Sequence, residues 1–265
     1  MKPVSRVISL TTDFGTKDPY VGIMKGVIAS INPEVLVVDL THEVRSFDLK
    51  EAAFVLLASY RWFPPGTVHV VVVDPGVGTA RRPVLIVTRN YYFIGPDNGV
   101  LSWAARSDGI EAAYRLSNRA FMTKEVSYTF HGRDIFAPAA AWLTRGVKPE
   151  VLGEPIDPGS LEALGTLHCD SGEDYIRGSV VVVDKFGNVI TSCRDSPFRP
   201  GDRVRIEAKG GVWEAMFART FGEVPEGSLL VHINSLGFFE ISVNKGSASS
   251  MTELKPGDEV WVRKL

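Results

Sequence analysis

The chain has 265 residues, of which 45% are hydrophobic and 23% are charged, and its formal net charge is -2 at pH 7. This composition is that of an ordinary soluble globular protein, and the length favours two domains. The small net charge, without a long run of Lys or Arg, argues against a nucleic acid or an anionic membrane surface as partner.

The N-terminal sequence indicates a cytoplasmic protein, and that compartment guides the interpretation of the two cysteines. Residues 1–6 contain no apolar signal stretch, and no apolar run approaches the roughly 20 residues that span a bilayer. Cys169 and Cys193 form no CxxC or other metal-binding spacing. Because disulfides are rare in the cytosol, we interpret these two cysteines as unpaired thiols, and we expect no metal site.

Strand and helix patterns alternate in the first part of the chain. Short apolar runs rich in β-branched residues predict buried strands, and apolar residues at helical spacing predict helices between them. The predicted strands are residues 5–12, 35–40, 68–73, 84–88 and 91–94, and the predicted helices are residues 19–31, 49–62 and 135–143. This alternation is typical of βαβ units, so we predict an α/β domain with a mainly parallel sheet over residues 1–160.

Two of these helices have start signals in the sequence. Asp18 precedes Pro19, which predicts an N-cap at Asp18 because proline suits the first helical position. Asp48 is followed three residues later by Glu51, which predicts a capping pair at the start of the second helix.

The pattern changes after residue 160. Prolines and glycines indicate a connection here, and we take residues 161–175 as a linker. Short apolar runs separated by glycine-containing turns then predict strands at residues 179–183, 189–192, 203–208, 212–217, 229–233, 238–243 and 259–263. We therefore predict a smaller, antiparallel, β-barrel-like domain over residues 176–265.

Two carboxylates stand where strands of the predicted parallel sheet end. Asp13 follows the first strand, and Asp74 follows the third. Because ligands bind at the carboxyl ends of strands in open α/β sheets, this pair suggests a site. Further polar residues in nearby loops, among them Arg81 and His131, are candidates for its chemistry.

The common catalytic and phosphate-binding motifs are missing. The segment Asp74-Pro75-Gly76-Val77-Gly78-Thr79 lacks the third glycine of the dinucleotide fingerprint and the Gly-Lys-Ser/Thr ending of a P-loop. The sequence contains neither a Gly-x-Ser-x-Gly elbow nor a His-Glu-x-x-His zinc spacing. Neither a serine nucleophile nor bound zinc is therefore indicated.

The candidate residues also have structural interpretations. Asp13 alone can form a turn, and His131 can be a core histidine or the lead-in to a helix that Asp134 caps. The other histidines show no partner in the sequence, and we interpret them as structural: His42, His69, His168 and His232.

Five short segments together carry a family resemblance. They are Thr11-Thr12-Asp13-Phe14-Gly15, Val73-Asp74-Pro75-Gly76-Val77-Gly78, Pro96-Asp97-Asn98-Gly99, Phe130-His131-Gly132-Arg133-Asp134 and Asn234-Ser235. The chain thereby resembles the S-adenosylmethionine hydroxide adenosyltransferases, the hydrolase relatives of fluorinase and chlorinase. The resemblance implies an α/β N-terminal domain, a β C-terminal domain, and trimers with the substrate at the junction between neighbouring subunits. It implies S-adenosylmethionine and water as substrates, adenosine and methionine as products, and no cofactor.

The residue types suit this chemistry. Attack at the 5′ carbon expels methionine as a neutral thioether, so the leaving group needs no general acid, and only the water nucleophile needs activation. The family's water-activating trio matches Asp74, Arg81 and His131. Arginine stays protonated, which leaves Asp74 or His131 as the proton acceptor.

The resemblance also implies the substrate contacts. Asp13 matches the acid that accepts both ribose hydroxyls, and Phe47 packs on the sugar. At the methionine end it implies contacts from Asp18, Asp184 and Ser235. Around adenine it implies stacking by Phe221, a hydrogen bond from Asn188, and a pocket wall formed by Glu240 and Val243.

Two other functions use the same residues. Fluorinase-like proteins carry tyrosine where this chain has Asp74, Tyr-Ser where it has His131-Gly132, and threonine in place of Val77. An ionised Asp74 would repel a halide in a site of low dielectric constant, so the sequence favours water over halide as nucleophile. The second alternative is a sensor that binds adenosine or S-adenosylmethionine without turnover.

Overall fold

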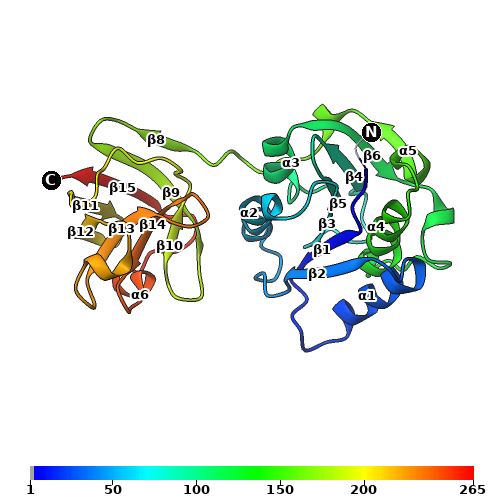
Figure 1. Cartoon of the computed structure of the whole chain (residues 1–265), viewed down its shortest axis with the longest axis horizontal. Coiled ribbons are helices and arrows are strands. Elements are labelled where there is room, and N and C mark those ends of the chain that lie inside the picture. The colour runs from blue at the N-terminus through cyan, green and yellow to red at the C-terminus, as the bar shows by residue number, and fades with distance from the viewer. Residues whose placement is uncertain (1–2) are drawn as a thin grey trace. The chain divides into compact units, whose positions relative to one another are not determined.

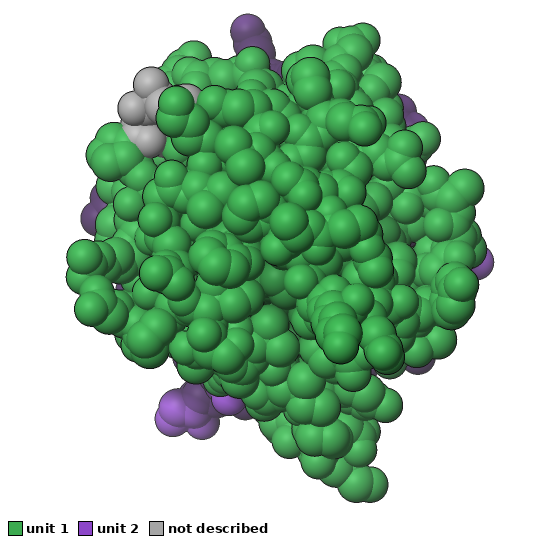
Figure 2. Space-filling view, turned by 90° about the vertical axis from the view of Figure 1, so that its right-hand side faces the viewer, with its two compact units in different colours: residues 1–164 green, residues 165–265 purple. Residues whose placement is uncertain are grey.

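The computed structural model describes residues 3–265, and the chain divides into two compact units between Leu164 and Gly165. Figure 1 labels the helices and strands, and Figure 2 shows residues 1–164 in green. Each unit has its own hydrophobic core. None of the helices among the described residues has the length and apolar character that a membrane span requires.

The first unit contains a seven-stranded sheet in the order β2-β1-β3-β5-β4-β6-β7. Four neighbouring strands are parallel: β1 (Val7–Thr12), β2 (Leu36–Thr41), β3 (Val68–Val72) and β5 (Tyr92–Pro96). Three further strands extend the sheet through antiparallel pairings: β4 (Pro83–Thr88), β6 (Ile110–Leu116) and β7 (Gly153–Ile156). The predicted α/β class is confirmed, and the antiparallel extension through β6 and β7 is an addition to the predicted strands.

Helices cover this sheet on two sides. They are α1 (Tyr20–Ile31), α2 (Leu49–Ser59), α3 (Ser102–Asp108), α4 (Ala137–Thr144) and the short α5 (Pro149–Leu152). Helix α1 packs against α4 and α2 against α3, and Figure 1 shows the two pairs on opposite sides of the sheet. Met24 and Ile28 of α1 join Ile8, Leu10 and Val70 of the sheet in one core. Apolar burial of this kind positions the strand ends that carry the polar loops.

Single turns complete the unit. A π-helical turn (Gly132–Phe136) leads into α4, and 3-10 turns cover Tyr60–Trp62, Arg119–Phe121 and Pro158–Ser160.

The two helix-start predictions have different outcomes. Helix α1 begins at Tyr20 after Pro19, with no side-chain cap, so the N-cap prediction for Asp18 is wrong. Asp48 does cap α2, because its Oδ1 accepts a hydrogen bond of 2.9 Å from the Glu51 backbone N–H. The Glu51 carboxylate accepts from the Arg45 backbone N–H, so the reciprocal half of the capping pair is absent.

The second unit is a closed seven-stranded β-barrel, because β10 pairs with both β14 and β9. The barrel strands are β9 (Tyr175–Val183), β10 (Val189–Thr191), β11 (Arg203–Ala208), β12 (Gly211–Phe217), β13 (Leu229–Ile233), β14 (Phe239–Val243) and β15 (Glu259–Lys264). All pairings are antiparallel except that between β12 and β13. A 3-10 turn (Phe221–Glu223) and helix α6 (Ala248–Thr252) lie in its connections. The predicted barrel-like class is thus confirmed.

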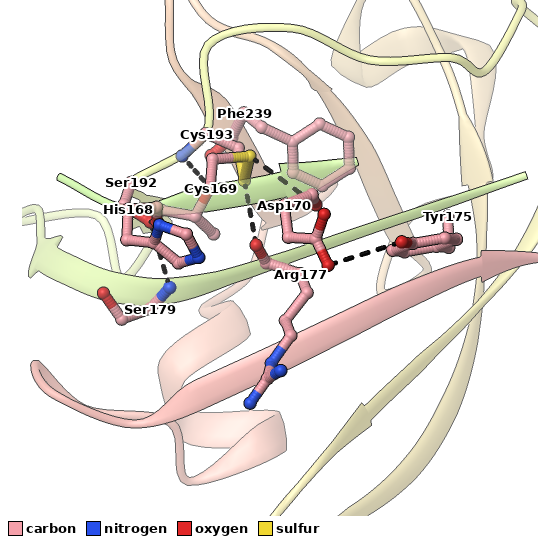
Figure 3. Close-up of a disulfide and its surroundings, with 10 residues drawn as sticks. His168, Cys169, Asp170, Tyr175, Arg177, Ser179, Ser192, Cys193 and Phe239 are labelled. Carbon is pink, nitrogen blue, oxygen red and sulfur yellow. Dashed lines mark hydrogen bonds between the residues drawn. A yellow bond between two sulfur atoms is a disulfide. The ribbon is translucent and has the colours of Figure 1, made fainter. Parts of the chain in front are cut away.

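The two cysteines form a disulfide, so the interpretation as unpaired thiols is wrong (Figure 3). Cys169 lies on β8 (Cys169–Ser171), a short strand within the predicted linker. Its partner in the ladder is Gly178 of β9. A Cβ atom on Gly178 would lie 2.8 Å from the Sγ of Cys193, so the missing side chain makes room for the sulfur bridge. Strand pairing thereby brings together two thiols whose sequence separation of 24 residues carries no such signal.

Candidate functional site

The loop between β3 and β4 brings Asp74 and Arg81 together. Backbone N–H groups of Val77 and Thr79 donate to the carbonyls of Asp74 and Gly76, which makes two successive turns. Arg81 consequently returns to Asp74, with its Nε 2.9 Å from Oδ1 and its Nη2 bonded to Oδ2. Only 9% and 6% of the two side chains are exposed, so the pair is shielded from water. Bidentate pairs of this kind fix the guanidinium and the carboxylate in one plane.

His131 joins this pair from the turn before α4. Its Nδ1 lies 2.7 Å from Nη2 of Arg81. Because a guanidinium only donates, Nδ1 must be the acceptor, and the neutral ring carries its proton on Nε2. Burial and the Arg81 charge lower the pKa of His131 below its ordinary value, although Asp74, Asp134 and the Ser127 backbone act in the opposite direction. The imidazole is therefore neutral at pH 7.

One nitrogen of this cluster has no partner. Nη1 of Arg81 is buried, and no described residue forms a hydrogen bond with it. Unsatisfied buried donors are rare in native proteins.

The buried Asp134 holds the segment that carries His131. Its carboxylate accepts hydrogen bonds from the Ser127 backbone N–H at 2.8 Å, the Thr123 hydroxyl at 2.9 Å and the Arg133 guanidinium. Burial raises the pKa of Asp134, but these hydrogen bonds outweigh burial and lower it to about 2. Asp134 is thus a structural carboxylate within the loop. It is not the cap of a helix, because it lies inside the π-helical turn.

A cavity of about 320 Å³ adjoins this cluster. Four of the predicted site residues line it: Asp13, Phe47, Asp74 and His131. Asp13 Oδ2 accepts a hydrogen bond of 2.9 Å from the Phe47 backbone N–H, and Phe47 adopts a left-handed φ of 68°. The structure therefore places a carboxylate and an exposed aromatic ring beside the Asp74 cluster.

Three aromatic residues in this cavity were not among the predicted site residues. Phe14, Tyr20 and Phe130 line it, with ring centroids 5.3 to 5.8 Å apart. Phe14 directly follows Asp13 and Phe130 directly precedes His131, so their positions in the sequence could have identified them as cavity residues. Asp18 does not line this cavity. It borders a separate depression with Lys25, Asp39 and His42.

The second unit contains a larger pocket of about 900 Å³. It is lined by all six predicted site residues of this unit: Asp184, Asn188, Phe221, Ser235, Glu240 and Val243. Phe186 and His232 also line it. The β9–β10 turn and the ends of β13 and β14 thus converge on one concave surface.

Glu240 is engaged by its neighbours within this pocket. Oε1 accepts from the Ser242 hydroxyl at 2.7 Å and lies 3.0 Å from His232 Nε2, while Oε2 accepts from Asn234 Nδ2 at 2.8 Å. Burial raises the pKa of Glu240, but these three hydrogen bonds outweigh it and lower the pKa below its usual range. Glu240 therefore holds His232 and Asn234 in place in the wall of the pocket.

His232 is a pocket residue that the sequence interpretation missed. It is the cross-strand partner of Glu240, and its ring meets that of Phe221 edge to face with centroids 5.1 Å apart. The strand register that makes these contacts is not visible in the sequence.

No cluster of three or more His, Cys, Asp or Glu side chains within residues 3–265 is arranged to hold a metal ion. The polar residues described above bond to one another and to the backbone.

Comparisons with known proteins agree on one family. Residues 8–153 match the SAM hydroxide adenosyltransferase N-terminal domain, and residues 178–261 match its C-terminal domain. An (R)-S-adenosyl-L-methionine hydrolase of Salinispora arenicola is 39% identical over 96% of this chain and 97% of its own length. A fluorinase of Nocardia brasiliensis is 25% identical over 97% and 96% of the two chains.

A solved structure matches the fold closely. The crystal structure of an uncharacterized conserved protein from Thermotoga maritima superposes with a TM-score of 0.92 at 41% identity, covering 97% of this chain and 99% of that one. With both domain models matched and hydrolase relatives at this identity, the chain belongs to the SAM hydroxide adenosyltransferase family.

Proposed function

We propose that this protein hydrolyses S-adenosyl-L-methionine to adenosine and L-methionine, with water attacking the 5′ carbon in line with the leaving sulfur. The contact of Arg81 with both Asp74 and His131, beside the cavity that Asp13 lines, is the observation that carries the proposal. The names of the hydrolase relatives specify the (R) form of the substrate. We therefore expect turnover of the (R) sulfonium epimer.

The hydrogen bonds favour Asp74 over His131 as the proton acceptor. Nδ1 of His131 already accepts from Arg81, and the neutral tautomer has a proton on Nε2, so neither ring nitrogen is a free base. A carboxylate has about four acceptor positions, of which Arg81 occupies two on Asp74. Asp74 thus keeps capacity to take the proton of a water molecule.

Arg81 has an electrostatic role in this proposal. Its positive charge, held against Asp74 and His131, would stabilise the developing hydroxide. The proton of water passes to Asp74, the new O–C5′ bond forms, and the C5′–S bond breaks to leave neutral methionine. Water is the only co-substrate that this balance requires.

The substrate contacts remain those that the family resemblance implies. Asp13 keeps Oδ1 available for ribose hydroxyls while Oδ2 holds the Phe47 backbone. Phe221 offers an aromatic face, and Asn188 a hydrogen-bonding amide, in the pocket of the second unit. Asp18, Asp184 and Ser235 are proposed for the methionine end, and Glu240 and Val243 for the adenine pocket.

Halide transfer is the weaker alternative. The hydrolase relative is 39% identical and the fluorinase only 25%, and the buried Asp74 carboxylate is unsuited to a halide. A sensor without turnover would use the same pockets, and only measured turnover separates it from an enzyme.

We further propose a homotrimer with active sites at the junctions between neighbouring subunits, as the resemblance implies. Light scattering would give the mass of the assembly. A monomer with full activity would contradict the shared site. We also propose that the protein resides in the cytoplasm.

The decisive test is incubation of the protein with (R)-S-adenosyl-L-methionine in halide-free ¹⁸O-labelled water. We expect labelled adenosine and methionine, and we expect Asp74→Ala to form none while it still binds adenosine. Intact substrate bound by the wild-type protein would indicate a sensor. Loss of adenosine binding in the variant, with normal turnover per bound substrate, would contradict the role of Asp74.

A further inference from the structure

The β9–β10 turn contains a carboxylate that is occupied by its own loop. Asp184 Oδ1 accepts hydrogen bonds of 2.9 Å from the backbone N–H groups of Phe186 and Asn188. Its Oδ2 accepts a third, also of 2.9 Å, from the side-chain amide of Asn188. Three of about four acceptor positions on this carboxylate are thus filled within five residues of chain. Asp184 therefore holds the loop and keeps about one acceptor position for a ligand.

These contacts decide which way the Asn188 amide faces. An ionised carboxylate only accepts hydrogen bonds, so the group that faces Asp184 must be the NH₂ of Asn188. Turning the amide over would place its oxygen against Oδ2 and lose a hydrogen bond. Only 7% of Asn188 is exposed, so water cannot replace that bond at low cost.

The fixed amide presents a defined pattern to the pocket that Asn188 lines. Its Oδ1 is an acceptor with no partner among the described residues, and its second N–H remains a donor. Adenine offers the complementary pair, an N6 amino donor and the N7 acceptor, which asparagine can bond together. A 6-oxo purine offers two acceptors on the same edge, and its O6 would face the Asn188 oxygen.

We propose that Asp184 is the positioning residue that makes this pocket select a 6-amino purine over a 6-oxo purine, by holding the Asn188 amide in one orientation. The inference deepens the proposed function, on which it rests for the identity of the ligand. This positioning role is additional to the contact with methionine that is proposed above for Asp184.

The test compares adenosine with inosine, which differ at the 6 position, by calorimetric binding to the full-length protein. We expect wild type to bind adenosine about tenfold or more tightly than inosine, the discrimination typical of a bidentate base contact. Asp184→Asn keeps an oxygen for the two backbone N–H groups but offers NH₂ to Asn188. The Asn188 amide can then turn over, and the adenosine-to-inosine ratio should fall by about tenfold.

Two further variants separate this role from loop damage. Asn188→Ala should abolish the preference even if Asp184→Asn folds poorly. Asp258 accepts from the Lys255 backbone N–H at 2.9 Å in another turn of the same unit, so Asp258→Asn is a matched control that should keep the ratio. A preference that survives Asp184→Asn or Asn188→Ala, or that is lost in Asp258→Asn, would overturn the inference.

Failure of the inference is distinguishable from failure of the proposed function. A wild type that hydrolyses S-adenosylmethionine but binds both nucleosides equally overturns only the base selection. A wild type that prefers adenosine but leaves S-adenosylmethionine intact contradicts only the hydrolase activity.

Discussion

Arg81 bonds to both Asp74 and His131, the other two residues of the proposed catalytic trio. Its planar guanidinium group makes both contacts at once. We predict that Arg81→Lys lowers kcat by about a hundredfold or more, because lysine cannot bond both Asp74 oxygens and His131 at once. Adenosine binding should change little. Rate measurements at saturating substrate check this.

The neighbouring arginine supplies a control. Arg82 bonds to Asp97 Oδ2 at 2.7 Å and to Ser160, whereas Arg81 bonds to Asp74 and His131. Arg82→Lys should therefore lower stability and leave kcat near the wild-type value. Equal losses of kcat in the two variants would show that neither arginine acts directly.

The pH dependence of activity follows from His131. Burial and the Arg81 charge lower its pKa, so the ring stays neutral as the pH falls past 6.5, the ordinary value for histidine. Protonation would remove the Nδ1 acceptor and set two cations together. The acid limb of kcat/KM should therefore lie below pH 6.5. A limb at or above that value, assigned to His131 by NMR titration, would contradict the arrangement.

At the scale of elements, the turn after β3 depends on Gly78. Gly78 has a φ of 76°, and a Cβ atom there would lie 2.3 Å from the Tyr128 carbonyl oxygen. Gly78→Ala must therefore displace either the Asp74 loop or the segment that carries His131. We predict at least a tenfold loss of kcat, measured alongside adenosine binding.

Gly227 is the matched control for this substitution. It has the same φ of 76°, and nothing lies within 4 Å of the position that a Cβ atom would take, so Gly227→Ala introduces backbone strain without a clash. It should destabilise the protein by about 1 kcal/mol and leave kcat unchanged. A similar loss of kcat in both variants would show that strain alone is responsible.

Element prediction succeeded where the signal is local. The buried strands β1 and β3 and the Asp48 cap of α2 were correctly predicted, because β-branched runs and capping side chains act over a few residues. Strand β6 was missed because its half-exposed pattern depends on β4 and β7 beside it. The predicted cap at Asp18 failed because Pro19, one residue later, occupies the N-cap position of α1.

At the scale of the whole molecule, the disulfide between Cys169 and Cys193 ties β8 to the barrel (Figure 3). Its two cysteines are 24 residues apart. Reduction should destabilise the second unit by about 3 kcal/mol, because the unfolded chain regains the conformational entropy that the cross-link removes. Calorimetry with and without reductant, with thiol titration to verify reduction, measures this. An unchanged transition in the reduced protein would show that the strand pairing suffices.

The sequence by itself determined the two fold classes, because periodicity and turn chemistry are local properties of the chain. Short motifs and the family resemblance they carry supplied part of the lining of the two pockets, but not three aromatic residues of the first or His232 of the second. Only the tertiary structure decided how those residues are connected. Strand register pairs His232 with Glu240. The folding of loops back on themselves sets the neutral tautomer of His131 and fills the carboxylate oxygens of Asp184. Such contacts join residues whose mutual distance is set by the packing of whole elements, and no local pattern records that distance.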